Sequence, residues 1–113
     1  MALQAVAEAR QTFLVEHYRP GLGADELGRL VACVRNTVAG LEREGKPLRF
    51  LRSTIVPRDE SFLCVLEAPS EHLIREAYAR AGIPFERMQV LRLGPQRRRS
   101  VQIARNRCAR FAR

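Results

Sequence analysis

Four short runs of β-branched and aromatic residues alternate with two longer helical patterns, and this order constrains the fold more than any other feature of the chain. The strand-like runs are residues 11–18, 48–56, 61–68 and 87–93, and the helical patterns are residues 24–44 and the segment between Ser70 and Gly82. Along the chain, the predicted order of elements is therefore β-α-β-β-α-β.

The longer helix is predicted from the spacing of its apolar residues, which recur every three or four positions and so define one buried face. These residues are Leu27, Leu30, Val31, Val34, Val38 and Leu41. Asp25 and Glu26 suit the positive N-terminal end of the helix dipole. Gly45, followed by Pro47, marks the end of the helix.

Turn and cap residues delimit the other elements. Ser70 suits a helix N-cap, and Gly82 can adopt the left-handed conformation that ends a helix. The polar residues 57–60 join two strand-like runs and so predict an antiparallel hairpin. The buried stripe predicted for the second helix is Leu73, Ile74, Ala77 and Ala81.

This element order predicts an α+β domain of the ferredoxin-like, split βαβ type. In that fold a four-stranded antiparallel sheet carries both helices on one face. Residues 11–93 would form the domain, and residues 94–113 would form a basic C-terminal tail. A chain of 113 residues fits one such domain.

The other face of the predicted sheet has no helix to cover it, although its residues are largely apolar. In the first strand, Phe13 and Val15 point to one face, while Leu14 points to the other. An uncovered apolar sheet face is usually an interface. We therefore predict a homodimer that packs through this open sheet face, as in a dimeric α+β-barrel assembly.

The charge of the chain is concentrated at its C-terminal end. Residues 1–91 balance twelve basic against twelve acidic side chains, so the whole net charge of +8 lies in residues 92–113. Such a segment could bind phosphate groups of nucleic acid or an anionic surface. The tail residues expected to do so are Arg97, Arg98, Arg99, Arg105 and Arg107.

Several classes of protein are disfavoured by the composition. The chain contains no apolar run of about eighteen residues that could form a transmembrane helix, and its first residues lack the pattern of an export signal. Its three widely spaced cysteines form neither a disulfide framework nor a zinc-binding CxxC pair. We therefore predict a cytoplasmic protein with reduced thiols.

Few residues in the domain have side chains that could bind a ligand or take part in a reaction. His17 and His72 are the only histidines, and we expect His72 to face solvent. Cys64 lies in the middle of a strand and is predicted to be a buried thiol with a raised pKa. Glu67 points to the opposite face from Cys64, where it would bind a ligand, accept a proton or pair with Arg49.

Three motifs give the chain a resemblance to a known family. They are Tyr18-Arg19-Pro20-Gly21, Cys64-Val65-Leu66-Glu67-Ala68-Pro69 and Arg80-Ala81-Gly82-Ile83-Pro84. With Ser53 and Asp59 between them, they resemble the small bacterial nickel-binding proteins, a ferredoxin-like family of largely unknown function, over residues 11–93. The resemblance implies a dimeric, cytoplasmic protein that binds a divalent metal and has no established enzyme reaction.

The same resemblance implies where metal ligands would lie. Members that bind metal carry a histidine near the end of the first strand, where this chain has His17. They tend to carry further histidines on the second helix and after its terminal glycine, where this chain has Tyr78 and Ile83. The expected metal ligands are therefore His17, with Glu67 and Tyr78 as weaker oxygen ligands.

Three functions are compatible with these observations. The first is a small, non-enzymatic binding protein whose ligand is nickel or another divalent metal. The second is a dimeric α+β-barrel enzyme of monooxygenase or isomerase type, with His17 and Glu67 lining a pocket. The third is nucleic-acid binding through the basic tail.

Overall fold

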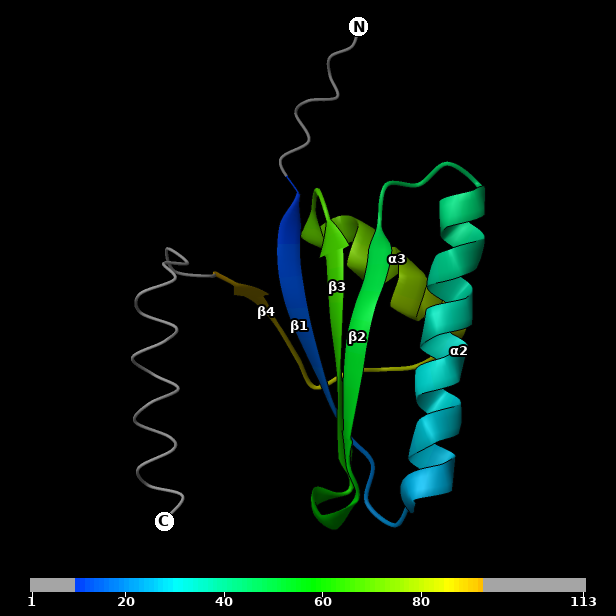
Figure 1. Ribbon diagram of the computed structural model, residues 1–113, viewed down its shortest axis with the longest axis vertical. Helices are drawn as coiled ribbons and strands as arrows, with labels where there is room; N and C mark the ends of the chain where they lie inside the picture. The colour runs from blue at the N-terminus through cyan, green and yellow to red at the C-terminus, as the bar shows by residue number, and fades with distance from the viewer. Residues whose placement is uncertain (1–9, 93–113) are drawn as a thin grey trace, which may run out of the picture.

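The elements follow one another as the sequence pattern predicts (Figure 1). The structure, a computed structural model, describes residues 10–92. Its elements are β1 (Gln11–Tyr18), α2 (Ala24–Arg43), β2 (Arg49–Val56), the 3-10 turn η1 (Pro57–Asp59), β3 (Ser61–Ala68), α3 (Glu71–Ala81) and β4 (Arg87–Leu91). The predicted order β-α-β-β-α-β is confirmed. The predicted tail, residues 94–113, lies outside the described residues.

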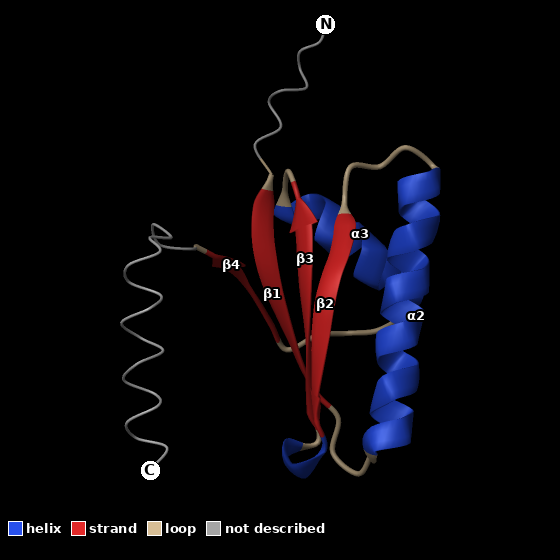
Figure 2. Cartoon of the chain, viewed as in Figure 1, coloured by secondary structure: helices blue, strands red, loops and turns tan. Residues whose placement is uncertain are grey.

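The four strands form one antiparallel sheet in the order β2-β3-β1-β4. The two central strands, β1 and β3, pair along their whole length, with His17 opposite Phe62 and Val15 opposite Cys64. Both helices lie on the same side of the sheet (Figure 2). The structure therefore confirms the ferredoxin-like fold, and no helix from residues 10–92 covers the second sheet face.

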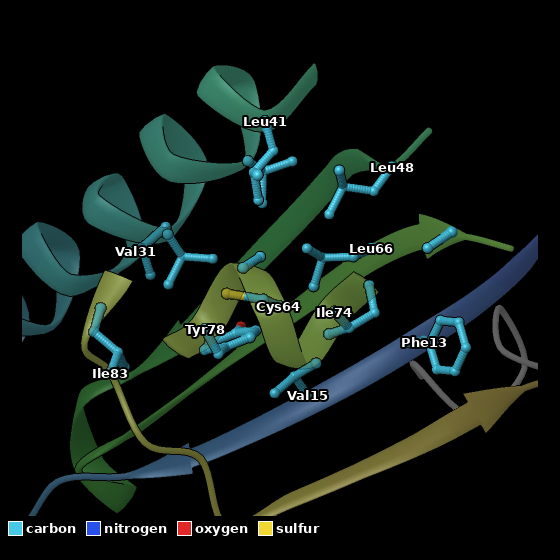
Figure 3. Packing of buried hydrophobic residues seen from close by; sticks show 14 of the residues in the cluster. Phe13, Val15, Val31, Leu41, Leu48, Cys64, Leu66, Ile74, Tyr78 and Ile83 are labelled. Carbon is cyan, nitrogen blue, oxygen red and sulfur yellow. The ribbon is translucent and has the colours of Figure 1, made fainter. Parts of the chain in front are cut away.

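The core lies between the sheet and the two helices (Figure 3). Every second residue of β1 and β3 is buried, because alternate side chains of a strand point to opposite faces. Helix α2 contributes five buried residues at helical spacing, which are Leu27, Val31, Val34, Val38 and Leu41. The apolar face predicted for this helix is thus the face that packs on the sheet.

The ends of the helices show which local predictions hold. Gly82 follows α3 with a φ of 72°, the left-handed conformation expected of it. Ser70 occupies the N-cap position of α3, but its side chain makes no capping hydrogen bond. The buried residues of α3 are Ile74, Ala77 and Tyr78, so the predicted stripe omitted Tyr78. In the part of the chain that the structure describes, neither helix has the length and apolar character to cross a membrane.

Candidate functional site

His17 is the one buried polar or charged residue within residues 10–92. It lies on the helix-covered face of β1 and is 1% exposed. Its ring stacks on that of Phe62, with the ring centroids 3.9 Å apart and the planes within 6°. His17 thus lies in the interior of the sheet, because β1 is flanked by β3 and β4.

The hydrogen bonding of His17 determines which ring nitrogen is free. Nδ1 lies 3.0 Å from the backbone oxygen of Phe62. A carbonyl oxygen can only accept, so Nδ1 carries the proton and Nε2 keeps its lone pair. Nε2 is buried and has no hydrogen-bond partner among the described residues. The result is an unused electron-pair donor inside the core.

Burial keeps this imidazole neutral. Removal from water disfavours the charged form and lowers the pKa of His17 to about 4, against a smaller opposing effect of the bond to Phe62. At neutral pH the imidazole is therefore uncharged, which is the form that binds metal ions.

Tyr78 packs its ring near that of His17. Its ring centroid is 5.2 Å from that of His17, and its ring is edge-on to Phe85 at 5.2 Å. The hydroxyl is buried and lies within hydrogen-bonding reach of the Cys64 thiol. Burial raises the pKa of Tyr78 far above its ordinary value, and the neighbouring Cys64 thiol raises it further. The hydroxyl is thus a neutral oxygen donor.

Cys64 adds a sulfur atom to the same region (Figure 3). It follows Phe62 by two residues on β3, so both side chains point to the helix-covered face. The side chain is fully buried, and burial raises the pKa of the thiol to about 11, as predicted. Cys64 was expected only to pack, and the pairing of β1 with β3 is the signal that places it diagonally across from His17.

Glu67, the third predicted ligand, is not brought to His17 and Tyr78. It lies on the open sheet face and pairs with Arg10 at 3.4 Å and Arg49 at 3.8 Å. The pairing with Arg49 is the alternative that the sequence left open. The enzyme alternative requires His17 and Glu67 to line one pocket. They do not, because they lie on opposite faces of the sheet. Within residues 10–92, no three His, Cys, Asp or Glu side chains gather as a metal cluster would need.

A hollow of about 300 Å³ opens on the surface beside Tyr78, between the end of α3 and the loop that leads to β4. It is lined by Arg75, Tyr78, Ala79, Gly82, Ile83, Pro84 and Phe85. Tyr78 and Ile83, the two positions at which the resembling family tends to carry histidine, both line it. The hollow thus lies beside the Tyr78 side chain.

Arg19 holds the α3–β4 loop against the end of β1. Its guanidinium donates hydrogen bonds to the backbone oxygens of Tyr18 and Pro84 and to the carboxylate of Glu86. Glu86 in turn accepts a 2.9 Å bond from the backbone nitrogen of Tyr18. We call this set of contacts the Arg19 latch. It fixes the loop next to His17.

The last of the predicted residues are a histidine of α3 and the arginines of the tail. His72 is exposed at the start of α3, as expected. The predicted nucleic-acid residues of the tail lie outside the described part of the chain. They are Arg97, Arg98, Arg99, Arg105 and Arg107.

Comparison with known proteins finds one family and one solved structure. A family described as nickel responsive protein SCO4226-like matches residues 13–90. The crystal structure of SCO4226 from Streptomyces coelicolor A3(2) is similar, with a TM-score of 0.59 and 19% sequence identity over 74% of this chain and 99% of that one. At that identity the likeness supports the fold alone. No curated protein matches.

Proposed function

Because the chain belongs to the SCO4226-like family of nickel responsive proteins, we propose that it is a small binding protein whose ligand is a divalent metal ion, with nickel as the first candidate. His17 is the principal ligand through Nε2, and Tyr78 offers an oxygen. The observation that carries the proposal is the buried lone pair of Nε2, which has no partner among the described residues.

The chemistry of these donors fits such an ion. Imidazole nitrogen suits nickel and zinc, and it binds only when it is neutral. With the pKa of His17 lowered to about 4, protons do not compete for the imidazole at neutral pH. Buried polar atoms normally have a partner, so the unpaired Nε2 of His17 is available to bind an ion. Glu67 is left out of this donor set because it lies on the other face of the sheet.

A nickel titration by calorimetry tests the proposal. We expect the wild type to bind about one ion per chain, and His17→Phe to weaken binding at least about tenfold. Phenylalanine keeps a ring against Phe62 and removes only the nitrogen donors. The matched control is His72→Gln, which removes the exposed imidazole and should leave binding unchanged. A wild type without saturable binding would show the proposal to be wrong, and so would undiminished binding by His17→Phe.

We also propose that two copies of the chain pack through the open sheet face. This face carries the half-buried residues Leu14, Leu63 and Val65, and Leu51, which is 41% exposed. Paired charges flank this apolar centre, with Glu16 bonded to Arg87 at one end and Glu67 close to Arg49 at the other. An apolar patch rimmed by polar residues is typical of a protein interface. In this proposal the protein is cytoplasmic, where Cys33 and Cys64 stay reduced.

Replacing Leu14 by arginine should convert the dimer into a monomer. The substitution places a charge in the middle of the apolar patch, and desolvating that charge opposes association. Sedimentation equilibrium should show the dissociation constant rising at least about a hundredfold, which is about 2.7 kcal/mol. Asn36→Arg adds the same charge on the exposed side of α2 and should leave the dimer intact. A monomeric wild type would contradict this proposal and leave the metal proposal standing.

A further inference from the structure

We propose that the chain binds the phosphate backbone of nucleic acid, and that a hollow between Arg10 and Arg92 is the place where the folded domain holds a phosphate group. The site uses none of the residues of the metal proposal and is independent of it. It also goes beyond the basic tail predicted from the sequence, because it assigns residues of the folded domain to the binding.

The hollow lies where β1 begins and β4 ends. The pairing of Thr12 with Leu91 brings these two ends of the domain together. The hollow has a volume of about 280 Å³ and is lined by Arg10, Gln11, Thr12, Val90, Leu91 and Arg92. Two arginines, a glutamine and a threonine thus line one concave site, and no acidic residue from the described part of the chain lines it.

The charge at this hollow is positive. Arg10 lies 3.4 Å from a carboxylate oxygen of Glu67, and Arg49 lies 3.8 Å from the same oxygen, so two guanidinium groups share one negative charge. Arg92 is exposed and makes no ion pair with another residue of the range 10–92. The hollow therefore carries an excess of positive charge and attracts an anionic group.

The sequence that follows the hollow continues the same charge. Arg92 is the first of eight arginines in residues 92–113, a segment that contains no acidic residue. An extended chain spans at most about 3.6 Å per residue, so Arg97 lies within about 18 Å of Arg92 whatever path the chain takes. The successive arginines 97–99 can therefore reach phosphates close to one that is held in the hollow.

The chemistry of the hollow favours a nucleic acid over a membrane surface. Arginine binds a phosphate through two parallel N–H donors, and glutamine and threonine side chains commonly donate to phosphate and sugar oxygens. A concave site receives a group that projects from a chain, whereas a bilayer presents its phosphates on a flat surface. Since the contacts are made to phosphates, we expect the affinity to be independent of base sequence and to fall steeply with salt.

Fluorescence anisotropy with a labelled single-stranded oligonucleotide tests the proposal on the whole chain of 113 residues. We expect Arg92→Gln to weaken binding at least about threefold, and the double variant Arg10→Gln/Arg92→Gln at least about tenfold. Each phosphate contact that is removed should also reduce the slope of log Kd against log salt concentration by about 0.7.

Arg58→Gln is the matched control. It removes an exposed arginine from η1, which joins β2 to β3 at the opposite end of the sheet from the hollow. Its affinity and its salt slope should equal those of the wild type. An equal loss of affinity in Arg58→Gln and Arg92→Gln would show that binding follows total charge, and it would overturn the inference.

Glu67→Gln gives a test of the opposite sign. It removes the carboxylate beside Arg10 and so frees that guanidinium for a phosphate. Binding should become at least about twofold tighter. A damaged fold would weaken binding, so a gain of affinity cannot come from misfolding. Weaker or unchanged binding in Glu67→Gln would contradict the placement of a phosphate beside Arg10.

Two further results would overturn the inference. The first is unchanged binding in the double variant, together with loss of binding when arginines 97–99 are replaced by glutamine, because the tail would then be the whole site. The second is binding to phosphatidylserine vesicles without binding to the oligonucleotide, because the partner would then be an anionic membrane. Nickel binding is measured separately, so none of these results bears on the proposed function.

Discussion

Phe62→Ala is expected to lower the free energy of unfolding by about 3 to 5 kcal/mol, the range typical of a fully buried aromatic residue replaced by alanine. Phe62 is fully buried near the start of the central strand β3, and its ring stacks on His17. Removing the ring leaves a cavity on the helix-covered face and exposes the imidazole to it. Domains of this kind are stable by only about 5 to 15 kcal/mol, so the variant should be close to unfolding at room temperature.

Urea denaturation of three variants measures this effect. Phe62→Leu keeps most of the side-chain volume and should lower the free energy of unfolding by about 1 kcal/mol. Phe50→Ala removes a half-buried ring from the edge strand β2 and should cost about half as much as Phe62→Ala. If Phe50→Ala and Phe62→Ala lowered the free energy of unfolding equally, the stack of Phe62 on His17 would contribute no more to stability than the half-buried ring of Phe50.

Acid should destabilise the wild type more than His17→Phe, by about 3 kcal/mol between pH 7 and pH 4. In the folded protein, burial lowers the pKa of His17 to about 4, whereas in the unfolded chain the ordinary value is 6.5. Between these two values the unfolded state binds a proton that the folded state does not. The stability that depends on a neutral His17 is therefore complete above about pH 6.5 and is lost as the pH falls towards 4.

Urea denaturation at each pH, with the variant subtracted from the wild type, isolates this contribution. The carboxylate of Glu16, whose pKa is lowered by its hydrogen bond with Arg87, is present in both proteins and cancels in the difference. His17→Phe loses the bond to Phe62 at every pH, which adds a constant offset and no slope. His72→Gln should behave as the wild type does, because His72 is exposed. Parallel pH profiles for the wild type and His17→Phe would show that His17 is protonated as readily in the folded state as in the unfolded one.

Most of the fold could be predicted because each element satisfies a local rule. The alternation along β1 placed Phe13, Val15 and His17 on one face of the strand, and the three- and four-residue spacing defined the buried face of α2. Gly82 was predicted as a helix end because it can take a positive φ, and it does. These rules concern residues that are close together in the chain.

The composition of the site could be predicted only in part, because it depends on which strands pair. His17 and Glu67 both lie near the C-terminal ends of their strands. Since β1 and β3 are antiparallel, those ends lie at opposite ends of the sheet, and Glu67 pairs with Thr12 instead. The sequence did not predict that Tyr78 is buried in the core. A tyrosine at the border of a helix's apolar face can point either to solvent or to the protein interior. The Arg19 latch depends on the path of a loop backbone, which no periodicity indicates.

The latch has a kinetic consequence. The donors of the proposed site lie behind a loop that Arg19 ties to the end of β1, and β1 itself is held by strands on both sides. In the proposed site, an ion that passes this loop would enter only when the loop moves. Capture and release would then both proceed at the rate of loop opening, which is slower than diffusion. Such a protein would exchange its ion slowly even when its affinity is modest. The residence time of the ion would then depend on the contacts of Arg19 and Glu86 rather than on the metal ligands.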